Sequence, residues 1–452
     1  MTTAASTAAA ATSTVDDGSR VGPIRLVIAG SLVTGAVLAG VLTLVVFAGG
    51  TEAVITGAAL LGFAVGWAML AVLSARMTDQ PQRWALVPAA GLAATGLWLL
   101  VLAPGDRVLT ASGWVWPPLL LALAVWMGFR VRRSLAAGSG RWLLYPVVAV
   151  TAAAALGGAV ETVGLAADQR ASAMPGKLYD VGGHQLHLDC TGSGAPTVVL
   201  ISGLGEFSAS WARIAPDVAG TTRVCAYDRA GQGWSEDAPD PQDGLQAAAD
   251  LHTLLGRAGE HGPYVLVGHS IGGDYALTYA ARYPEQVAGM VLLDTTPPYE
   301  VTATNHSSTP GPVALLPSLA RLGIGRLLPT SFWSALPEPA ASQVEAFSTS
   351  PRGARNTAAE SGTMPALLSQ AQALSTLDSA PLVVLTAAEH VAVPEWAAAH
   401  DRMAALSTNS RHRHADATHA GLLDQSHGAR LSARAIDDVV SAARTGSALP
   451  PD

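Results

Sequence analysis

The chain has few charged residues, only two cysteines and no excess of basic side chains. Charged residues make up 13% of its 452 residues, whereas apolar residues make up 50%. This balance is typical of chains with membrane segments. The net charge of −8 argues against nucleic-acid binding, which needs a basic surface. The cysteines and histidines form no ligand pattern, so neither a metal site nor a cofactor is expected.

The charges and histidines are unevenly distributed along the chain. Residues 1–170 contain ten arginines against seven acidic residues, whereas residues 171–452 contain 16 basic and 27 acidic residues. All twelve histidines follow residue 171. Because histidine is the side chain that exchanges protons near neutral pH, proton chemistry is expected in the second part of the chain.

The first part consists of a polar tail and a series of apolar stretches. Residues 1–22, rich in Ala, Thr and Ser, are expected to be disordered. Each following stretch approaches the roughly 20 residues that span a bilayer. The five stretches are Leu26–Ala48, Ala53–Ala75, Trp84–Ala103, Val108–Phe129 and Trp142–Val160. The sequence therefore predicts a transmembrane helical domain of about five helices over residues 23–167. The first stretch is too long for a signal-peptide core.

The arginines of this part predict its orientation. With the N-terminus inside, the inner segments carry eight arginines, and the outer loops between spans carry only Arg107. This bias fits the positive-inside rule, and five spans then place everything after residue 165 outside the cytoplasm. The fifth stretch ends near Glu161; if it did not insert, the second part would be cytoplasmic. The first four stretches contain no ionisable residue, which favours an anchor over a transport path.

The second part, residues 168–452, alternates short β-like runs with helical ones. The runs "TVVLIS", "RVCAYD", "YVLVGHS", "GMVLLD" and "LVVLT" are apolar and short, and helical patterns such as Leu245–Arg257 lie between them. Buried strands that alternate with helices predict an α/β fold with a mostly parallel sheet.

A serine between glycines follows one of these strands. "YVLVGHS" reads as a strand and "IGGDYALTYAARY" as a helix, with Gly268, Ser270 and Gly272 in the turn. A turn this sharp strains the serine backbone and needs small neighbours, and it lifts the hydroxyl above the sheet edge. The helix start beside it offers N–H groups to an oxyanion. Ser270 is therefore the candidate nucleophile.

Several motifs in order resemble the α/β-hydrolase superfamily, in the branch of lipases, esterases and prolyl aminopeptidases. They are "LISGLGEFSASW" (200–211), "YDRAGQGWS" (227–235), "GHSIGG" (268–273), "YPEQVAGMVLLDTTPP" (283–298) and "ATHAGLLDQ" (417–425). The resemblance covers the C-terminal 60% of the chain. It implies an eight-stranded sheet with a helical lid, for which residues 295–380 are expected.

The resemblance also assigns roles to single residues. It makes His419 the base, and it makes the N–H groups of Leu204 and Ile271 the oxyanion hole. The resemblance leaves two alternatives for the acid that orients His419. His390 stands where the family usually has Asp, so the alternatives are Asp294 after "GMVLL" and Glu389. His269 is expected to point away from the site, and His412, His414 and His427 are expected at the surface. In the lid, Leu327, Phe332 and Trp333 either line the pocket or pack within the lid.

Cys190 and Cys225 are candidates for a disulfide. In the fold that the resemblance implies, the strands carrying them are antiparallel neighbours, so the sulfurs could pair. The alternative is two buried free thiols. A disulfide would fit an oxidising compartment and thus the five-span topology.

Together these features predict a multi-pass cell-membrane protein whose extracytoplasmic domain is a serine hydrolase. An ester or lipid-like acyl substrate is expected, and Ser270 argues against epoxide and haloalkane hydrolysis, in which Asp is the nucleophile. Cofactor-free peroxidase chemistry would use the same residues. The alternative is a catalytically weak or inactive domain that binds or senses a ligand and acts through the membrane helices.

Overall fold

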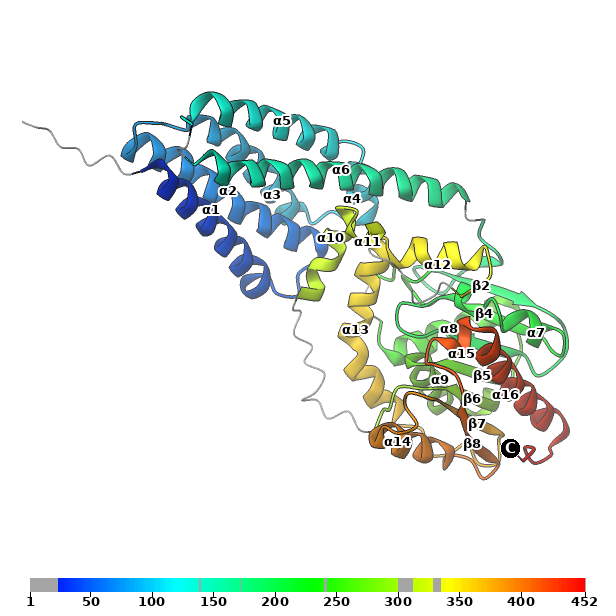
Figure 1. Ribbon diagram of the computed structural model, residues 1–452. Coiled ribbons are helices and arrows are strands. Elements are labelled where there is room, and N and C mark those ends of the chain that lie inside the picture. The colour runs from blue at the N-terminus through cyan, green and yellow to red at the C-terminus, as the bar shows by residue number, and fades with distance from the viewer. Residues whose placement is uncertain are drawn as a thin grey trace, which may run out of the picture.

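The computed structural model describes residues 23–137, 140–171, 173–239, 242–299, 312–327 and 335–451. It consists of an elongated helical bundle followed by a domain built around one sheet (Figure 1). The expected tail, residues 1–22, lies outside the described residues.

Six helices in the described part of the chain form the bundle. Four of them are long and apolar enough to cross a membrane, and the bent pair α4–α5 makes a fifth span if it is counted as one. The helices are α1 (Ile24–Val41, extended by a π-helical turn Leu42–Val46), α2 (Glu52–Met77), α3 (Leu86–Leu102, preceded by the 3-10 turn Arg83–Ala85), α4 (Asp106–Ser112), α5 (Trp116–Ser134) and α6 (Arg141–Ala171).

Two of the five expected spans differ from their expected form. The stretch Val108–Phe129 is not one straight helix, because α4 and α5 meet at 47°. Pro117 and Pro118 at the start of α5 lack the N–H groups that would continue the helix from α4, so a new helix begins there. The last helix continues to Ala171, beyond the expected end at Val160, and Glu161 is buried within it.

Small residues bring the bundle helices together. A Cβ atom on Gly62 of α2 would lie 2.3 Å from the backbone nitrogen of Ala39 in α1, and one on Gly57 would lie 2.7 Å from the carbonyl oxygen of Gly96 in α3. Helices in lipid associate through such close backbone contacts, since burial of apolar surface provides little driving force there. In the bundle core, the Trp84 ring packs edge to face on Trp126 and at a tilt of 55° to Trp67.

The second domain contains an eight-stranded sheet with the order β1-β2-β4-β3-β5-β6-β7-β8. Strand β2 runs antiparallel to β4, and the pairs from β4 to β8 are parallel. The strands are β1 (Lys177–Asp180), β2 (Gln185–Thr191), β3 (Val198–Ile201), β4 (Val224–Tyr227), β5 (Tyr264–His269), β6 (Val287–Leu293), β7 (Leu382–Ala387) and β8 (Ser410–Ala415).

Helices cover both faces of this sheet, so its central strands are buried on both sides. One core includes Leu251, Tyr279 and Met403, and the other includes Val218 and Ile436. The first face carries α8 (Gly244–Ala258), α9 (Ile271–Arg282) and α14 (Pro394–Ala404), and the second carries α7 (Ala215–Ala219), α15 (Gly421–Asp424) and α16 (Ser426–Thr445).

A helical insertion between β6 and β7 lies between the sheet domain and the bundle (Figure 1). Its described helices are α10 (Leu316–Arg321), α11 (Ile324–Leu327), α12 (Ala340–Ser348) and α13 (Pro351–Ala371). Arg321 of α10 pairs with Glu52 and Asp106 of the bundle, and Arg326 of α11 pairs with Glu161 and Asp168 of α6. The insertion is therefore held by ion pairs at one end of the bundle.

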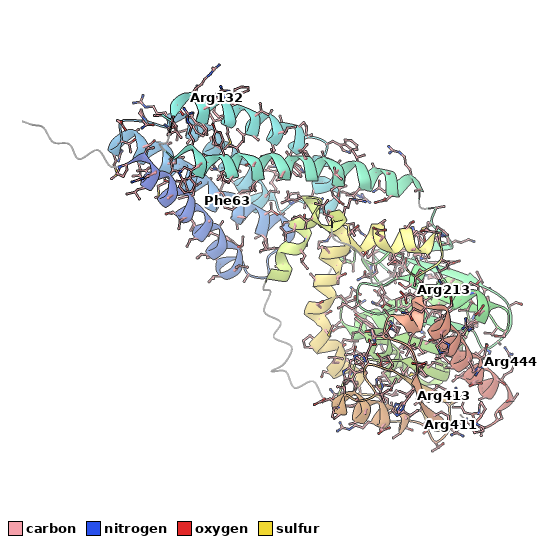
Figure 2. The ribbon with its side chains drawn as sticks, in the orientation of Figure 1. Phe63, Arg132, Arg213, Arg411, Arg413 and Arg444 are labelled. Atoms are coloured by element: carbon pink, nitrogen blue, oxygen red, sulfur yellow. A yellow bond between two sulfur atoms is a disulfide. The ribbon has the colours of Figure 1, made fainter. Side chains whose placement is uncertain are left out.

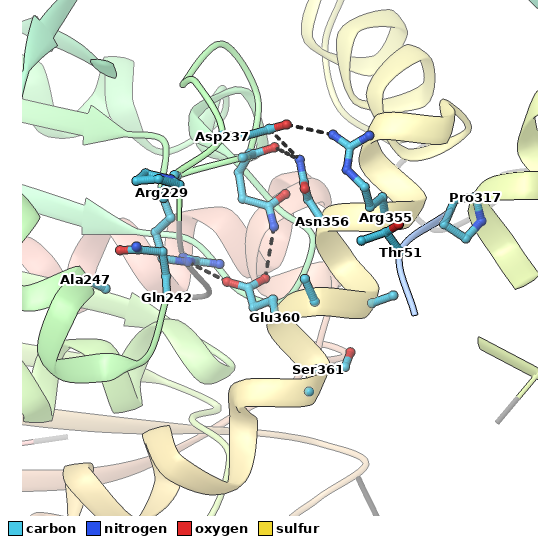
Figure 3. A pocket seen from close by; sticks show the side chains of 18 of the residues that line it. Thr51, Arg229, Asp237, Gln242, Ala247, Pro317, Arg355, Asn356, Glu360 and Ser361 are labelled. Carbon is cyan, nitrogen blue, oxygen red and sulfur yellow. Dashed lines mark hydrogen bonds and ion pairs between the residues drawn. The ribbon is translucent and has the colours of Figure 1, made fainter. Parts of the chain in front are cut away.

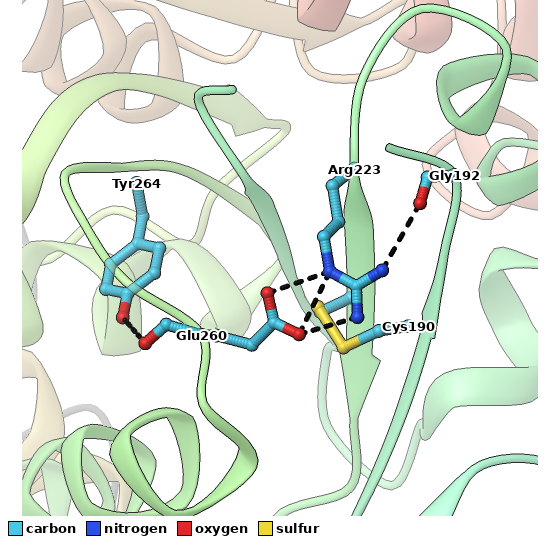
Figure 4. The surroundings of a disulfide bond; sticks show 6 residues. Cys190, Gly192, Arg223, Glu260 and Tyr264 are labelled. Carbon is cyan, nitrogen blue, oxygen red and sulfur yellow. Dashed lines mark hydrogen bonds and ion pairs between the residues drawn. A yellow bond between two sulfur atoms is a disulfide. The ribbon is translucent and has the colours of Figure 1, made fainter. Parts of the chain in front are cut away.

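A disulfide joins Cys190 of β2 to Cys225 of β4. The two residues are direct partners in the antiparallel ladder, with Cα atoms 4.0 Å apart. Figure 4 shows Arg223 beside it, in an ion pair with Glu260. The bond ties the antiparallel side of the sheet to its parallel centre.

Candidate active site

Ser270 occupies a strained turn between β5 and α9. Its φ angle is 54° and its ψ angle −130°, which few residues with a side chain adopt. A Cβ atom on Gly268 would lie 2.4 Å from the Cα atom of Gly273, and one on Gly272 would lie 2.2 Å from the Ile201 carbonyl oxygen. Only glycine fits at these two positions, so they allow the turn to form and leave Ser270 half-buried at the helix start.

The loop after β3 lies next to this turn and leaves one backbone donor unused. Gly203 N–H donates to Glu206 Oε2 (2.8 Å), and Gly205 N–H donates to Glu360 Oε2 (3.0 Å). Among the described residues, the N–H of Leu204 between them has no acceptor. Ile271 is the first residue of α9, so its N–H has no partner within the helix. Both groups are available to an anion beside Ser270.

Asp294 follows β6 and contacts two histidines. Its Oδ2 atom lies 2.5 Å from His419 Nδ1 and 2.6 Å from His390 Nδ1, and its Oδ1 atom accepts the Ala387 N–H at 3.0 Å. Asp294 is fully buried and has a φ angle of 45°. Ser270 and Asp294 are thus both held in backbone conformations that are unfavourable for their residue types.

The pKa of Asp294 is lowered from its usual value. Burial opposes ionisation, but the hydrogen bond and charge of His419, the Ala387 N–H and the charge of His390 outweigh it. Asp294 is therefore ionised near neutral pH. As an acceptor, it keeps the Nδ1 atom of each histidine protonated and leaves each Nε2 atom free to accept a proton.

Glu389, the other candidate acid, contacts His419 differently. Its Oε1 atom accepts the backbone N–H of His419 at 2.9 Å, and the ring contacts Asp294. Glu389 thus holds the loop that carries His419. The geometry of an orienting acid belongs to Asp294.

His269 does not point away from the site, contrary to the expectation. Its ring is fully buried and lies 4.5 Å from the ring of His419. Its Nδ1 atom is 3.0 Å from Glu206 Oε1, and its Nε2 atom is 3.0 Å from the His419 carbonyl oxygen. His269 therefore links the loop after β3 (residues 202–206, called the oxyanion loop after its predicted role) to the loop that carries His419.

The surface expectation holds for two of the remaining histidines. His414 and His427 are exposed. His412 is half-buried, because its ring lies between Thr386 Oγ1 and Asp401 Oδ1 at 2.7 Å from each. No contact of these three residues reaches Ser270 within the described part of the chain.

The comparisons with known proteins agree with this architecture. A family model described as the alpha/beta hydrolase fold matches residues 196–324. The crystal structure of the haloalkane dehalogenase DbeA from Bradyrhizobium elkani superposes with a TM-score of 0.50 at 20% identity, covering 60% of this chain and 99% of that one. The C-terminal domain is an α/β-hydrolase domain. The predicted fold, with its eight-stranded, mostly parallel sheet, is confirmed.

The relatives in sequence match only part of the chain. An uncharacterized protein of Schizosaccharomyces pombe is 35% identical over 152 residues, which are 26% of this chain and 28% of that protein. Lipase LipV of Mycobacterium tuberculosis is 40% identical over 116 residues, which are 24% of this chain and 41% of that protein. The matched segment thus spans less than half of these relatives.

One cluster in the α/β-hydrolase domain has the donor types of a metal site. Ligand atoms of Asp294, His390 and His419 lie within 4.8 Å of one another. The two Nδ1 atoms already contact the same carboxylate oxygen, so a cation would have to displace both hydrogen bonds. A second cluster contains Cys190 and Cys225, whose sulfurs are joined in the disulfide and offer no thiolate.

A cavity of about 710 Å³ lies beside the oxyanion loop (Figure 3). The residues that line it come from the loop after β4, from α8, α10 and α13, and from the turn between α1 and α2, and they include Arg229, Gln242, Glu360 and Thr51. Ser270, Leu204 and His419 do not line it. Of the expected pocket residues, Leu327 is 78% exposed, and Phe332 and Trp333 lie outside the described residues.

Sequence reasoning missed four residues around the site. His390 stands where the resemblance predicts an acid, and its position after β7 is the signal that could have identified it. Glu206 and Arg229 lie within motifs of the resemblance, which assigns them no role. Glu360 lies in the insertion, where no pattern singled it out.

Proposed function

We propose that this chain is a membrane-anchored serine hydrolase that cleaves an ester outside the cytoplasm, with Ser270, His419 and Asp294 as its catalytic residues. The observation that carries the proposal is the 2.5 Å contact between Asp294 Oδ2 and His419 Nδ1 next to the strained Ser270 turn. An ionised acid, a histidine fixed in one tautomer and a serine hydroxyl are the parts that acyl transfer needs.

The reaction follows from the positions of these groups. Ser270 Oγ attacks the ester carbonyl carbon while His419 Nε2 accepts the hydroxyl proton. The carbonyl oxygen becomes an oxyanion and accepts hydrogen bonds from the N–H groups of Leu204 and Ile271. The tetrahedral intermediate collapses, the C–O bond of the ester breaks, and His419 returns its proton to the departing alcohol.

Water completes the cycle. It attacks the acyl group on Ser270 and gives a proton to His419, and the acid product leaves as Ser270 recovers its proton. No hydrogen bond joins the Ser270 hydroxyl to His419 among the described residues, and such contacts often tighten only when substrate is bound. Asp294 stays ionised throughout and stabilises the imidazolium that forms.

The choice of an ester rests on the nucleophile and on one relative. A serine nucleophile yields an acyl intermediate, whereas epoxide and haloalkane substrates call for a carboxylate nucleophile. The relative named as a lipase supports an ester substrate, and the insertion over the site would act as the lid that selects it.

Two observations support insertion of the bundle into a membrane and an extracytoplasmic position of the hydrolase domain. Large apolar side chains such as Phe63 point outward from the bundle, and Arg132 lies at the bundle end remote from the hydrolase domain (Figure 2). If that arginine-rich end faces the cytoplasm, the hydrolase domain lies outside. The disulfide fits an oxidising compartment.

The test is labelling with a membrane-impermeant fluorophosphonate on intact cells and after lysis. We expect labelling of the full chain on intact cells and its reduction to background in Ser270→Ala. Ser447→Ala, which changes an exposed serine near the C-terminus, serves as the matched control and should label like the wild type.

The outcomes separate chemistry from topology. Label that appears only after lysis would place the domain in the cytoplasm and leave the hydrolase assignment intact. Absence of label in both samples would contradict an activated serine and favour the binding or sensing role.

A further inference from the structure

Helix α13 of the insertion reaches the oxyanion loop through Glu360. Glu360 Oε2 accepts the Gly205 N–H at 3.0 Å, and Glu360 Oε1 lies 2.7 Å from Arg229 Nε. The side chains of both charged residues are less than one-tenth exposed. Charge-assisted hydrogen bonds of this kind are short and strong, particularly where water is excluded.

Arg229 holds the other side of the same loop. Its two terminal nitrogens donate to the carbonyl oxygens of Ser202 (2.5 Å) and Gly203 (2.6 Å). Together with Glu360, it fixes the peptide groups on both sides of Leu204. The Leu204 N–H is thereby left as the donor that points away from these contacts.

Side chains of α13 also pack directly on the loops of the site. Gly205 has a φ angle of 66°, and a Cβ atom there would lie 2.6 Å from Thr357 Oγ1. Gly231 has a φ angle of 82°, and a Cβ atom there would lie 2.8 Å from the Asn356 amide. Because α13 and these loops are closely packed, a shift of α13 moves the oxyanion loop.

The same helix is tied to the membrane bundle one and a half turns earlier. Arg355 donates to Asp106 Oδ1 of the bundle (2.9 Å) and to Asp237 Oδ2 of the hydrolase domain (2.8 Å; Figure 3 shows the second contact). Asp106 also accepts from Arg321 of α10 at 2.7 Å. From Arg355 to Glu360 the helix rises only about 7.5 Å.

We propose that Glu360 is a positioning residue that sets the Leu204 N–H for the oxyanion, and that the bundle holds Glu360 in place through Asp106, Arg355 and α13. The membrane helices are then part of the catalytic unit as well as its anchor. This inference rests on the proposed function. Oxyanion donors must be placed to within about 0.5 Å, so a small displacement of α13 lowers the rate of the chemical step.

The test uses the full chain in nanodiscs, with Glu360→Ala, Glu360→Gln and Asp106→Asn. The matched controls are Glu345→Gln, an exposed acid on neighbouring α12, and Asp79→Asn, an exposed acid in the loop after α2. Two measurements are made on each protein: hydrolysis of p-nitrophenyl acetate, and hydrogen exchange of the peptide that spans residues 202–208.

Glu360→Ala is expected to lower kcat about tenfold to a hundredfold with little change in KM, since oxyanion contacts form only in the transition state. Glu360→Gln keeps an acceptor for Gly205 and should recover part of that loss. Asp106→Asn should lower kcat severalfold. Both Glu360→Ala and Asp106→Asn should speed exchange in residues 202–208, and the controls should match the wild type in both measurements.

Unchanged exchange in Glu360→Ala and Asp106→Asn would overturn the inference, whether or not the protein hydrolyses the ester. A loss that appears in KM alone would also overturn it, because the oxyanion hole would then be intact. Failure of the proposed function is a different result, in which the wild type shows no hydrolysis that is sensitive to Ser270→Ala. The exchange measurement would still test whether the bundle and Glu360 hold residues 202–208 in place.

Discussion

The bundle and the hydrolase domain bury opposite kinds of groups. In the bundle, large apolar side chains such as Val45, Val101 and Val150 are more than two-thirds exposed, and glycines and alanines lie between the helices. In the hydrolase domain, the central strands are buried on both faces, and charged pairs such as Arg229–Glu360 and His269–Glu206 are buried with them. The first arrangement suits lipid and the second suits water.

The difference shows where polar interactions are used in each region. Acidic residues of the bundle that pair with the insertion, namely Glu52, Asp106, Glu161 and Asp168, all meet its arginines at one end. In the hydrolase domain, buried pairs surround the candidate site itself. Substitutions at the helix contacts inside the bundle should therefore affect helix packing, whereas substitutions around the candidate site should affect activity and its pH response.

The largest effect is expected from Asp294→Asn. The amide would no longer hold His419 in the required tautomer or stabilise its imidazolium, so kcat should fall by about 10³–10⁴-fold. Steady-state hydrolysis of p-nitrophenyl acetate measures this fall in kcat. The bundle should be untouched, and the protein should stay in the membrane fraction.

Asp217→Asn, an exposed aspartate on α7, is the matched control and should keep full activity. A loss below tenfold in Asp294→Asn would contradict the role of Asp294. In that case Glu389→Gln would be the next variant to measure.

His269→Asn should destabilise the hydrolase domain by about 3 kcal/mol by leaving Glu206 buried without its partner. Burial opposes both charges, yet their mutual attraction prevails: the pKa of His269 is raised and the pKa of Glu206 is lowered. Because the pKa of His269 is raised, its charge stabilises the fold fully below about pH 6.5. This stabilisation is lost as pH rises through the pKa that His269 has in the folded state. The lowered Glu206 pKa stabilises it above about pH 4.3.

Denaturant unfolding of the full chain in detergent at pH 6 and pH 9 measures this difference. The gap between wild type and His269→Asn should be larger at pH 6. His414→Asn, at an exposed position on β8, is the control. A gap that does not depend on pH would show that the pair is not charged.

Gly62→Leu should act on the bundle alone. Its side chain would collide with the backbone of Ala39, and overpacking of this kind costs about 1–3 kcal/mol. Gly91→Leu is the matched control, because open space surrounds that glycine in α3. Thermal unfolding in detergent should show a lower midpoint for Gly62→Leu only; equal midpoints would mean that α1 and α2 do not pack as described.

The apolar stretches and the hydrolase motifs were readable from the sequence because they are local. A run of about 20 apolar residues or a strand followed by G-x-S-x-G depends on neighbours in the chain. The break between α4 and α5 had a local signal in Pro117 and Pro118, which the length of the apolar stretch concealed. The domain boundaries, the orientation and the catalytic roles remain predictions.

The acid and the supporting residues were not readable in this way. Asp294 and Glu389 both follow strands, and nothing in the sequence tells which carboxylate faces the His419 ring. His390 lies 96 residues from Asp294 in the chain, and Glu360 lies 155 residues from Gly205. Contacts at such separations depend on strand order and on where the insertion packs.

The sequence by itself determined that membrane-type helices precede an α/β-hydrolase domain, since hydrophobic period and turn chemistry act between near neighbours. Only the tertiary structure decided that Asp294 meets both His419 and His390, that His269 joins Glu206, and that α13 connects the bundle to the oxyanion loop. These are contacts between side chains from distant segments, and their geometry exists only after the sheet has formed and the insertion has packed between it and the bundle.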